Sequence, residues 1–240
     1  MFVRLMVMRV ALLLKSFELS LSGACVSPAA FLKGMAMIVT INSTNPQVRF
    51  IRKVVECLRE GGVVAYPTDT VYGIGCDIFN QKALKRIYQL KQRDPRKPFS
   101  FICSDISDIT QYAQVSNFAF KIVKRHLPGP YTFVLEATRV APSLLMTRQH
   151  TVGIRIPDNA ICNMIVRELG HPLVTTSANI SGEDSLSDPL EIERVLGKQL
   201  DMVVDGGILR GEPSSVISLV GDQVEVLREG GGDISWISRD

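Results

Sequence analysis

The sequence lacks the short motifs that mark the commonest nucleotide-binding and hydrolytic sites. It has no Gly-x-x-x-x-Gly-Lys-Ser/Thr phosphate loop, no Gly-x-Gly-x-x-Gly fingerprint and no Gly-x-Ser-x-Gly turn for a nucleophilic serine. It also has no His-Glu-x-x-His and no Cys-x-x-Cys, and its three histidines are scattered, so no metal site is predicted. A nucleotide, if one binds, must be held by another arrangement of residues.

The cysteines are too few and too scattered for a disulfide framework. Five is an odd number, and no two of them are close in the sequence. Such cysteines are typical of a reducing compartment, where they pack as small apolar side chains. We therefore expect a cytoplasmic protein that uses these thiols as buried apolar groups: Cys25, Cys57, Cys76, Cys103 and Cys162.

Net charge is absent from most of the chain. The formal net charge of +3 arises in residues 1–34, which hold four of the 27 basic and one of the 24 acidic residues, and this leaves 23 of each in residues 35–240. Strong nonspecific binding of nucleic acid needs many phosphate contacts. The bulk charge of residues 35–240 therefore does not favour it.

Residues 1–36 are predicted to be an extension outside the folded domain. Their apolar run, Val10–Leu14, is interrupted by Lys15 and is too short to span a bilayer. We interpret the segment as an extension that precedes a functional start at Met35 or Met37. A weak export or organelle signal is the alternative. Residues 37–240 are expected to form one domain.

Strand and helix patterns alternate through residues 37–240, and 46% of all residues are apolar, enough for a substantial core. The apolar spacing predicts helices over 46–60, 83–93, 105–112, 118–127, 159–169 and 189–196, with Asn45, Ser104 and Asp188 as N-terminal caps. Apolar runs predict strands over 63–66, 99–103, 131–137, 151–156, 172–176, 202–205, 215–219 and 224–228. The expected fold is a single α/β domain with a twisted mixed β-sheet, flanked by helices, and an open cleft.

The stretch from Gly61 to Arg93 is the first candidate for a binding site. An apolar strand ends at Pro67 in a hydroxyl-rich loop that contains one carboxylate, Asp69. Ligands of α/β proteins usually bind at such strand ends, and Gly73 and Gly75 would permit close approach of backbone to ligand. The alternative is an ordinary turn, which the same residue types favour.

Lys91 and Arg93 follow this loop and suit an anionic ligand, since arginine binds phosphate bidentately and lysine acts as a point charge. Side chains two residues apart point to opposite sides of a helix but to the same side of an extended segment. The functional interpretation therefore predicts an unwound segment, which Pro95 favours. The alternative is an ordinary solvated run of charges together with Arg96 and Lys97.

Two further strand ends provide polar candidates. Arg155 lies within an apolar strand, where a charge is rarely unpaired, so it meets a carboxylate either of the protein or of a ligand. Ser177 and Asn179 follow another strand, and we expect them to donate hydrogen bonds to a ligand oxygen, with a simple turn as the alternative.

Taken together in this order, these segments resemble the YrdC/TsaC family of threonylcarbamoyl-AMP synthases. The resemblance covers about residues 45–230. The residues that carry it are Pro67-Thr68-Asp69-Thr70-Val71-Tyr72-Gly73, Lys91-x-Arg93 with Lys97-Pro98, Pro128-Gly129-Pro130-Tyr131-Thr132, Gly153-Ile154-Arg155-Ile156-Pro157, Thr176-Ser177-Ala178-Asn179 and Pro213-Ser214-Ser215-Val216.

The resemblance implies an enzyme that joins L-threonine, bicarbonate or carbon dioxide, and ATP, accompanied by Mg²⁺, and releases pyrophosphate. Its product would feed a separate transferase that modifies tRNA. Lys91 and Arg93 would be the catalytic pair. Nucleotide binding is assigned by motif to Lys91, Arg93, Lys97, Ser177, Asn179, Ser215 and Arg228. Threonine binding is assigned to Thr70, Thr132 and Arg155.

The chain departs from the family pattern in two places. Asp69 stands where many members have glutamate, and both residues supply a carboxylate. Residues 205–209 and 227–233 resemble the YciO branch, although this chain keeps the Ser-x-Asn signature that the branch lacks. Two alternative functions therefore stand beside the synthase: an RNA-binding module without catalysis, and a YciO-type hydrolase or transferase that acts on a threonylcarbamoyl nucleotide or a modified RNA.

Overall fold

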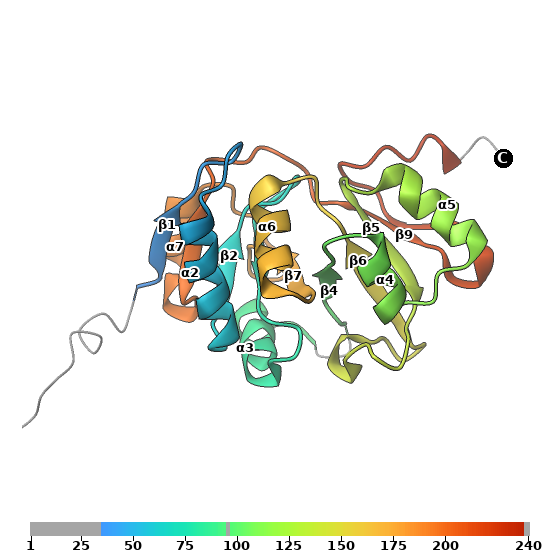
Figure 1. Ribbon diagram of the computed structural model, residues 1–240, viewed down its shortest axis with the longest axis horizontal. Helices are drawn as coiled ribbons and strands as arrows, with labels where there is room; N and C mark the ends of the chain where they lie inside the picture. The colour runs from blue at the N-terminus through green and yellow to red at the C-terminus, as the bar shows by residue number, and fades with distance from the viewer. Residues whose placement is uncertain (1–34, 95–96, 238–240) are drawn as a thin grey trace, which may run out of the picture. The chain divides into compact units, whose positions relative to one another are not determined.

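A ten-stranded mixed sheet organises the part of the chain that the computed structural model describes, residues 35–94 and 97–237 (Figure 1). The strand order is β1-β8-β2-β3-β7-β4-β6-β5-β9-β10. Four neighbouring pairs are parallel, β1/β8, β8/β2, β4/β6 and β5/β9. The expected mixed α/β sheet is thereby confirmed. The extension predicted for residues 1–36 lies, up to residue 34, outside the described residues.

The strands are short, and their bounds follow the apolar runs of the sequence closely. They are β1 (Met37–Thr40), β2 (Val64–Tyr66), β3 (Gly73–Gly75), β4 (Ser100–Ile102), β5 (Tyr131–Glu136), β6 (Thr151–Arg155), β7 (Leu173–Ser177), β8 (Met202–Asp205), β9 (Ser215–Ser218) and β10 (Glu225–Arg228).

The helices cover the sheet and divide its core in two. They are α2 (Val48–Arg59), α3 (Gln81–Lys91), α4 (Ile106–Tyr112), α5 (Asn117–His126), α6 (Ala160–Leu169) and α7 (Pro189–Leu196). Successive side chains of a strand face opposite sides of a sheet. Val64 and Tyr66 accordingly pack in the core beneath α2 and α6, which lie side by side (Figure 1), while Ala65 packs in the core that α3 and α7 complete.

Two predicted helix caps are wrong, by two residues at α2 and by one residue at α4. Asn45 is held in the preceding turn, where its N–H donates to Asn42 Oδ1 at 2.8 Å, and the cap position of α2 is Gln47. At α4 the cap is Asp105 rather than Ser104, and its carboxylate accepts from Asp108 N at 2.9 Å. Asp188 caps α7 as predicted.

The two loop glycines both pair in the sheet, but only for Gly75 does this correct the expected role beside a ligand, because Gly73 also lines a cavity. Gly73 and Gly75 belong to β3, which pairs with β2 and β7. A Cβ on Gly75 would lie 2.0 Å from Val174 O, and one on Gly73 would lie 3.1 Å from the ring of Tyr66. Glycine is therefore needed at position 75 so that the backbone of β7 can approach.

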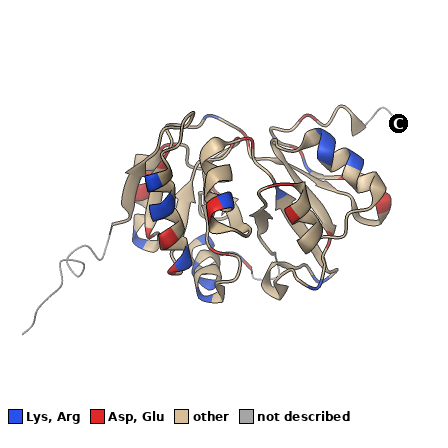
Figure 2. Ribbon diagram, in the orientation of Figure 1, with Lys and Arg blue, Asp and Glu red and all other residues tan. Residues whose placement is uncertain are grey.

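The cysteines and the surface charges match what composition predicts. Cys76, Cys103 and Cys162 are buried and free, and Cys57 is half-buried and free. Burial raises the pKa of the Cys57 thiol to about 11. Lys and Arg are interspersed with Asp and Glu along α2 and α6 (Figure 2). Within the described residues no helix has the length and apolar character needed to cross a membrane.

Candidate functional site

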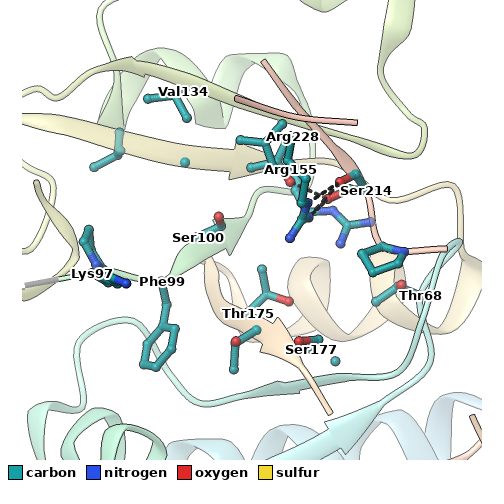
Figure 3. A pocket seen from close by; sticks show the side chains of 18 of the residues that line it. Thr68, Lys97, Phe99, Ser100, Val134, Arg155, Thr175, Ser177, Ser214 and Arg228 are labelled. Atoms are coloured by element: carbon teal, nitrogen blue, oxygen red, sulfur yellow. Dashed lines mark hydrogen bonds between the residues drawn. The ribbon is translucent and has the colours of Figure 1, made fainter. Parts of the chain in front are cut away.

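A cavity of about 310 Å³ opens where several strands of the sheet end. Arg155 is the last residue of β6, Ser177 of β7 and Arg228 of β10, and all three line the cavity. Figure 3 shows Arg155, Arg228 and Ser214 gathered at one end, with Lys97 beside Phe99 toward the other. The sheet topology thus brings together side chains that are far apart in the sequence.

Arg155 is a buried cation with both a protein partner and an unused donor. Its Nη2 donates to Asp69 Oδ1 at 2.9 Å and to Thr70 Oγ1 at 3.1 Å. Asp158 N donates to the second carboxylate oxygen of Asp69 at 3.1 Å. The arginine therefore meets a carboxylate of the protein, one of the two expected options. Its buried Nε has no hydrogen-bond partner, although the residue lines the cavity.

Hydroxyl contacts inside the loop place Thr70 against Arg155. Thr68 Oγ1 donates to Val71 O at 2.6 Å and accepts from Thr70 N at 3.1 Å. Thr68 and Thr70 are both buried. The loop is therefore an ordered hydrogen-bonded turn whose hydroxyls are turned inward, and Thr70 touches Arg155 from behind the cavity wall.

Lys91 is buried behind the opposite wall, with 2% of its surface exposed. Its Nζ donates to Ser177 O at 2.7 Å and to Asn179 Oδ1, and Ser177 Oγ lies 3.5 Å away. Burial, followed by the charge of Arg93, lowers the pKa of Lys91 to about 8. The lysine faces the Ser-x-Asn strand end as expected, but its own chain already supplies its acceptors.

The predicted unwound segment is wrong for Lys91 and right only for Arg93. Lys91 is the last residue of α3, and Gln92 then adopts a left-handed conformation with φ 48° that ends the helix. This turn redirects the chain, so that Arg93 Nε donates to Lys97 O at 2.8 Å and the guanidinium lies 5.2 Å from the centre of the Phe99 ring. Arg93 and Lys97 line the cavity, and Lys91 does not.

Arg228 closes the end of the cavity that holds Arg155. Its Nη2 donates to Ser214 O at 2.7 Å, and the Ser214 hydroxyl lies 2.8 Å from Thr132 Oγ1. Burial, followed by the charges of Arg155 and Arg93, lowers the pKa of Arg228. Because no carboxylate belongs to the described lining of the cavity, three guanidinium groups face a space suited to an anion.

Of the remaining predicted residues, Ser215 and Asn179 lie outside the wall, and Thr132 belongs to it. Ser215 is fully buried, and its hydroxyl donates to Gly232 O at 2.7 Å and accepts from Gly230 N at 3.0 Å, so it fixes the loop after β10. Asn179 contacts Lys91 and Ser177 from behind. Thr132 lines the cavity with several hydroxyls that sequence reasoning missed: Ser100, Thr147, Thr151, Thr175, Thr176 and Ser214. In the sequence, a hydroxyl residue within an apolar strand is the pattern that could have identified such lining residues.

No cluster of three metal-ligating side chains occurs in residues 35–94 and 97–237. The described cavity lining offers hydroxyl oxygens and cationic nitrogens but no carboxylate. Its donor set therefore fits a metal ion only as the companion of a phosphorylated ligand.

Comparison with known proteins places this geometry in context. The family model for Sua5, YciO and YrdC proteins, described as "Telomere recombination", matches residues 56–230. YciO of Escherichia coli is 40% identical over 202 residues, covering 83% of this chain and 98% of that protein, and its crystal structure superposes with a TM-score of 0.81. A putative threonylcarbamoyl-AMP synthase of Methanocaldococcus jannaschii is 37% identical over 208 residues, covering 84% of this chain and 97% of the relative.

Another solved relative is a complex with an amino acid. The structure of Sua5 from P. abyssi complexed with L-threonine has a TM-score of 0.77 and 30% identity to this chain, and the match covers 82% of this chain and 58% of Sua5.

Proposed function

Because this chain belongs to the family of Sua5, YciO and YrdC proteins, we propose that it is a threonylcarbamoyl-AMP synthase that uses L-threonine, bicarbonate and ATP. Relatives named threonylcarbamoyl-AMP synthase and the Sua5 complex with L-threonine support the substrate class. The observation that carries the proposal is the buried Arg155 Nε, which has no partner and belongs to a residue that lines the cavity.

Arg155 is proposed to bind the carboxylate of threonine. Its Nη2 is fixed by Asp69 and Thr70, and this contact orients the guanidinium and leaves Nε for the ligand. A buried donor without a partner costs free energy, and a ligand carboxylate would remove that cost. Thr70 would act by holding Arg155, while Thr132 would contribute a hydroxyl from the wall.

The phosphates of ATP are proposed to lie among Arg93, Lys97 and Arg228. Burial lowers the pKa values of Arg93 and Arg228 and so disfavours their charged forms, and a bound anion would stabilise those charges. Ser177, which Lys91 and Asn179 hold in place, would contact another part of the nucleotide. Mg²⁺ would enter with ATP and neutralise part of the phosphate charge.

In the proposed reaction the amine of threonine combines with bicarbonate, with loss of water, to form a carbamate. A carbamate oxygen then attacks the α-phosphorus of ATP, and the bond from that phosphorus to the leaving pyrophosphate breaks. The substrate is the nucleophile, so the protein has to position two anions and neutralise their charge. The cavity suits this task, since its described lining has three arginines and a lysine and lacks cysteine and histidine. The product would be handed to a tRNA-modifying transferase.

A YciO-type reaction on a threonylcarbamoyl nucleotide or modified RNA is the second candidate, and the 40% identity to YciO over 202 residues favours it. It would use the same cavity, with water as the group that attacks the substrate. An RNA-binding role without catalysis would need a basic surface rather than a cavity of this kind.

The test is to incubate the protein with Mg·ATP, L-threonine and bicarbonate and to measure pyrophosphate. Threonine-dependent release, lost in Arg155→Lys, supports the synthase. The matched control is Arg167→Lys, because Arg167 is exposed on α6. If pyrophosphate release does not depend on threonine, the synthase is wrong; consumption of added threonylcarbamoyl-AMP without its synthesis would then favour the YciO-type reaction.

A further inference from the structure

A second cavity, of about 940 Å³, lies between α5 and the C-terminal part of the described chain. Its described lining shares no residue with the cavity that Arg155 lines. The walls come from α5, from residues 222–224 ahead of β10 and from residues 233–237 behind it, all at the β10 end of the sheet (Figure 1). A cavity of this size suits a small organic ligand.

One wall of the second cavity is aromatic and fixed in place. Trp236 stacks on His126, with ring centroids 4.4 Å apart and planes 29° apart, and His126 meets the ring of Tyr131 edge-on at 5.1 Å. His126 Nδ1 donates to Ile122 O at 2.8 Å, which holds the imidazole in this position. Phe118 also lines the cavity and is 39% exposed, so its ring has free apolar surface. Rings arranged in this way offer stacking faces to a flat ligand.

Helix α5 adds two cations to the lining. Lys121 and Arg125 are exposed and, in the part of the chain that the structure describes, neither has a hydrogen bond or an ion pair. Like charges four residues apart on a helix repel each other, and α5 has no acidic residue to offset them (Figure 2). An anion bound between the two side chains would remove this repulsion.

The carboxylates of the lining already accept hydrogen bonds from the protein. Asp222 accepts from Ser116 Oγ at 2.6 Å, which ties the loop before β10 to the start of α5. Asp233 accepts from Ser235 N and from Ser235 Oγ, both at 2.9 Å. The anionic group of a ligand is therefore expected at the two cations of α5 rather than at these carboxylates.

A flat ring and an anionic group are the two parts of a nucleotide. Bases stack on aromatic side chains, and lysine and arginine bind phosphate. We propose that the second cavity is a nucleotide site, with the base against Trp236 and Phe118 and the phosphate at Lys121 and Arg125. The nucleotide is either a free mononucleotide or an unpaired nucleotide of an RNA strand. This site is independent of the proposed synthase, because it lies in a different cavity.

The test uses the fluorescence of Trp236, which is the only tryptophan of the chain and lines this cavity alone of the two. The full chain is titrated with AMP, adenosine and ribose 5-phosphate, with excitation at a wavelength that adenine does not absorb. AMP should quench the fluorescence with a Kd below about 1 mM. Adenosine lacks the phosphate and ribose 5-phosphate lacks the ring, so each should bind at least about tenfold more weakly.

A short single-stranded oligoadenylate distinguishes the two sources of the nucleotide. If the strand binds at least about tenfold more tightly than AMP, the site serves RNA, because neighbouring nucleotides then add contacts. If the strand binds no more tightly than AMP, the site serves a free nucleotide.

Variants assign the signal to the second cavity. Replacing both cations, Lys121→Gln with Arg125→Gln, should weaken AMP binding about tenfold. Lys124→Gln is the matched control, because Lys124 is exposed on the same helix and does not line the cavity. Phe118→Leu should weaken AMP about fivefold and leave ribose 5-phosphate unchanged. Arg228→Met changes the other cavity and should leave the quenching by AMP as it is.

The second site is wrong if neither AMP nor oligoadenylate quenches Trp236 below about 10 mM, or if AMP and ribose 5-phosphate bind equally well. A loss of affinity in Lys124→Gln as large as in the double variant would also overturn it. Quenching that Arg228→Met abolishes would do the same, since AMP would then bind in the other cavity. Because the fluorescence is measured without pyrophosphate release, failure of the synthase assay would leave the second site standing.

Discussion

Lys91 and Arg155 are both buried cations beside one cavity, and they differ in how their donors are used. Lys91 is 2% exposed and directs its ammonium at acceptors of its own chain, Ser177 O and Asn179 Oδ1. Arg155 is 7% exposed, binds Asp69 and Thr70 through one nitrogen, and has a buried Nε without a partner. The protein itself supplies acceptors for Lys91, whereas Arg155 keeps one donor that lacks an acceptor.

The chemistry of the two side chains explains the division. An ammonium is a compact point charge that three acceptors around it can satisfy, as the turn after β7 does. A guanidinium is a rigid fork, so a carboxylate bound at one nitrogen leaves another edge directed elsewhere. Lys91 is therefore suited to shape the wall, and Arg155 to bind a ligand. Variants at the two positions should separate these roles.

Replacing Arg155 should have the largest effect on catalysis. Arg155→Lys keeps a charge beside Asp69 but removes the unpartnered Nε, so kcat/KM for threonine should fall by about 100-fold through misplacement of the substrate. Initial-rate measurements of pyrophosphate release check this, with thermal unfolding to confirm that the variant is folded. A fall of less than about threefold would show that the unused donor does not face substrate.

The next largest effect should be on anion binding, which should distinguish Lys91 from Arg228, a cation that lines the cavity. Pyrophosphate affinity should fall about tenfold in Arg228→Met, the loss of one charge-assisted contact, and stay close to the wild-type value in Lys91→Met. Titration calorimetry at constant ionic strength provides the measurement. Equal losses of pyrophosphate affinity in the two variants would contradict the proposal that Arg228 binds the anion and that Lys91 does not.

The chain organisation could be predicted because it depends on local pattern. Apolar runs located eight of the strands, and Asp188 and the proline after it located the start of α7. β3 was missed because Gly73-Ile74-Gly75 resembles a loop. Gly75 is explained by the approach of Val174 in β7, and Gly73 lies against the ring of Tyr66. β1 was also missed; of its four residues only Val39 is buried, so the strand adds little to the core.

The site was predictable in its members and not in its hydrogen-bond directions. Motifs named Arg155 and Ser177, which line one cavity, and Lys91, which lies behind its wall. Which donors remain unused depends on partners 86 residues away, such as Asp69 for Arg155 and Lys91 for Ser177. No local pattern encodes such pairing, so the sequence led us to assign both cations to ligands.

Stability should show the opposite ranking of the cations from activity. Lys91→Met leaves Ser177 O and Asn179 Oδ1 buried without this donor, and we expect a loss of about 2 kcal/mol in the free energy of unfolding. The matched control is Lys85→Met, an exposed position on the same helix, which should change stability by less than about 0.5 kcal/mol. Urea unfolding compares the two. A stable Lys91→Met would mean that the lysine is held for a ligand after all.

The smallest expected effect is the pH dependence that Lys91 contributes. Burial lowers its pKa from 10.5 to about 8 in the folded protein, so above pH 8 the unfolded chain binds a proton that the folded chain releases. Stability from this group must then rise with pH between about 8 and 10.5 and be flat below that window.

Subtracting the free energy of unfolding of Lys91→Met from that of the wild type removes the other titrating groups. The difference should grow by no more than about 1 kcal/mol between pH 8 and 9, because the acceptors around Lys91 favour its charged form and oppose the effect of burial. A difference that does not change with pH would show that the hydrogen bonds to Ser177 and Asn179 fully offset the effect of burial on the pKa of Lys91. A difference that falls with pH would show that these hydrogen bonds outweigh burial and stabilise the protonated lysine.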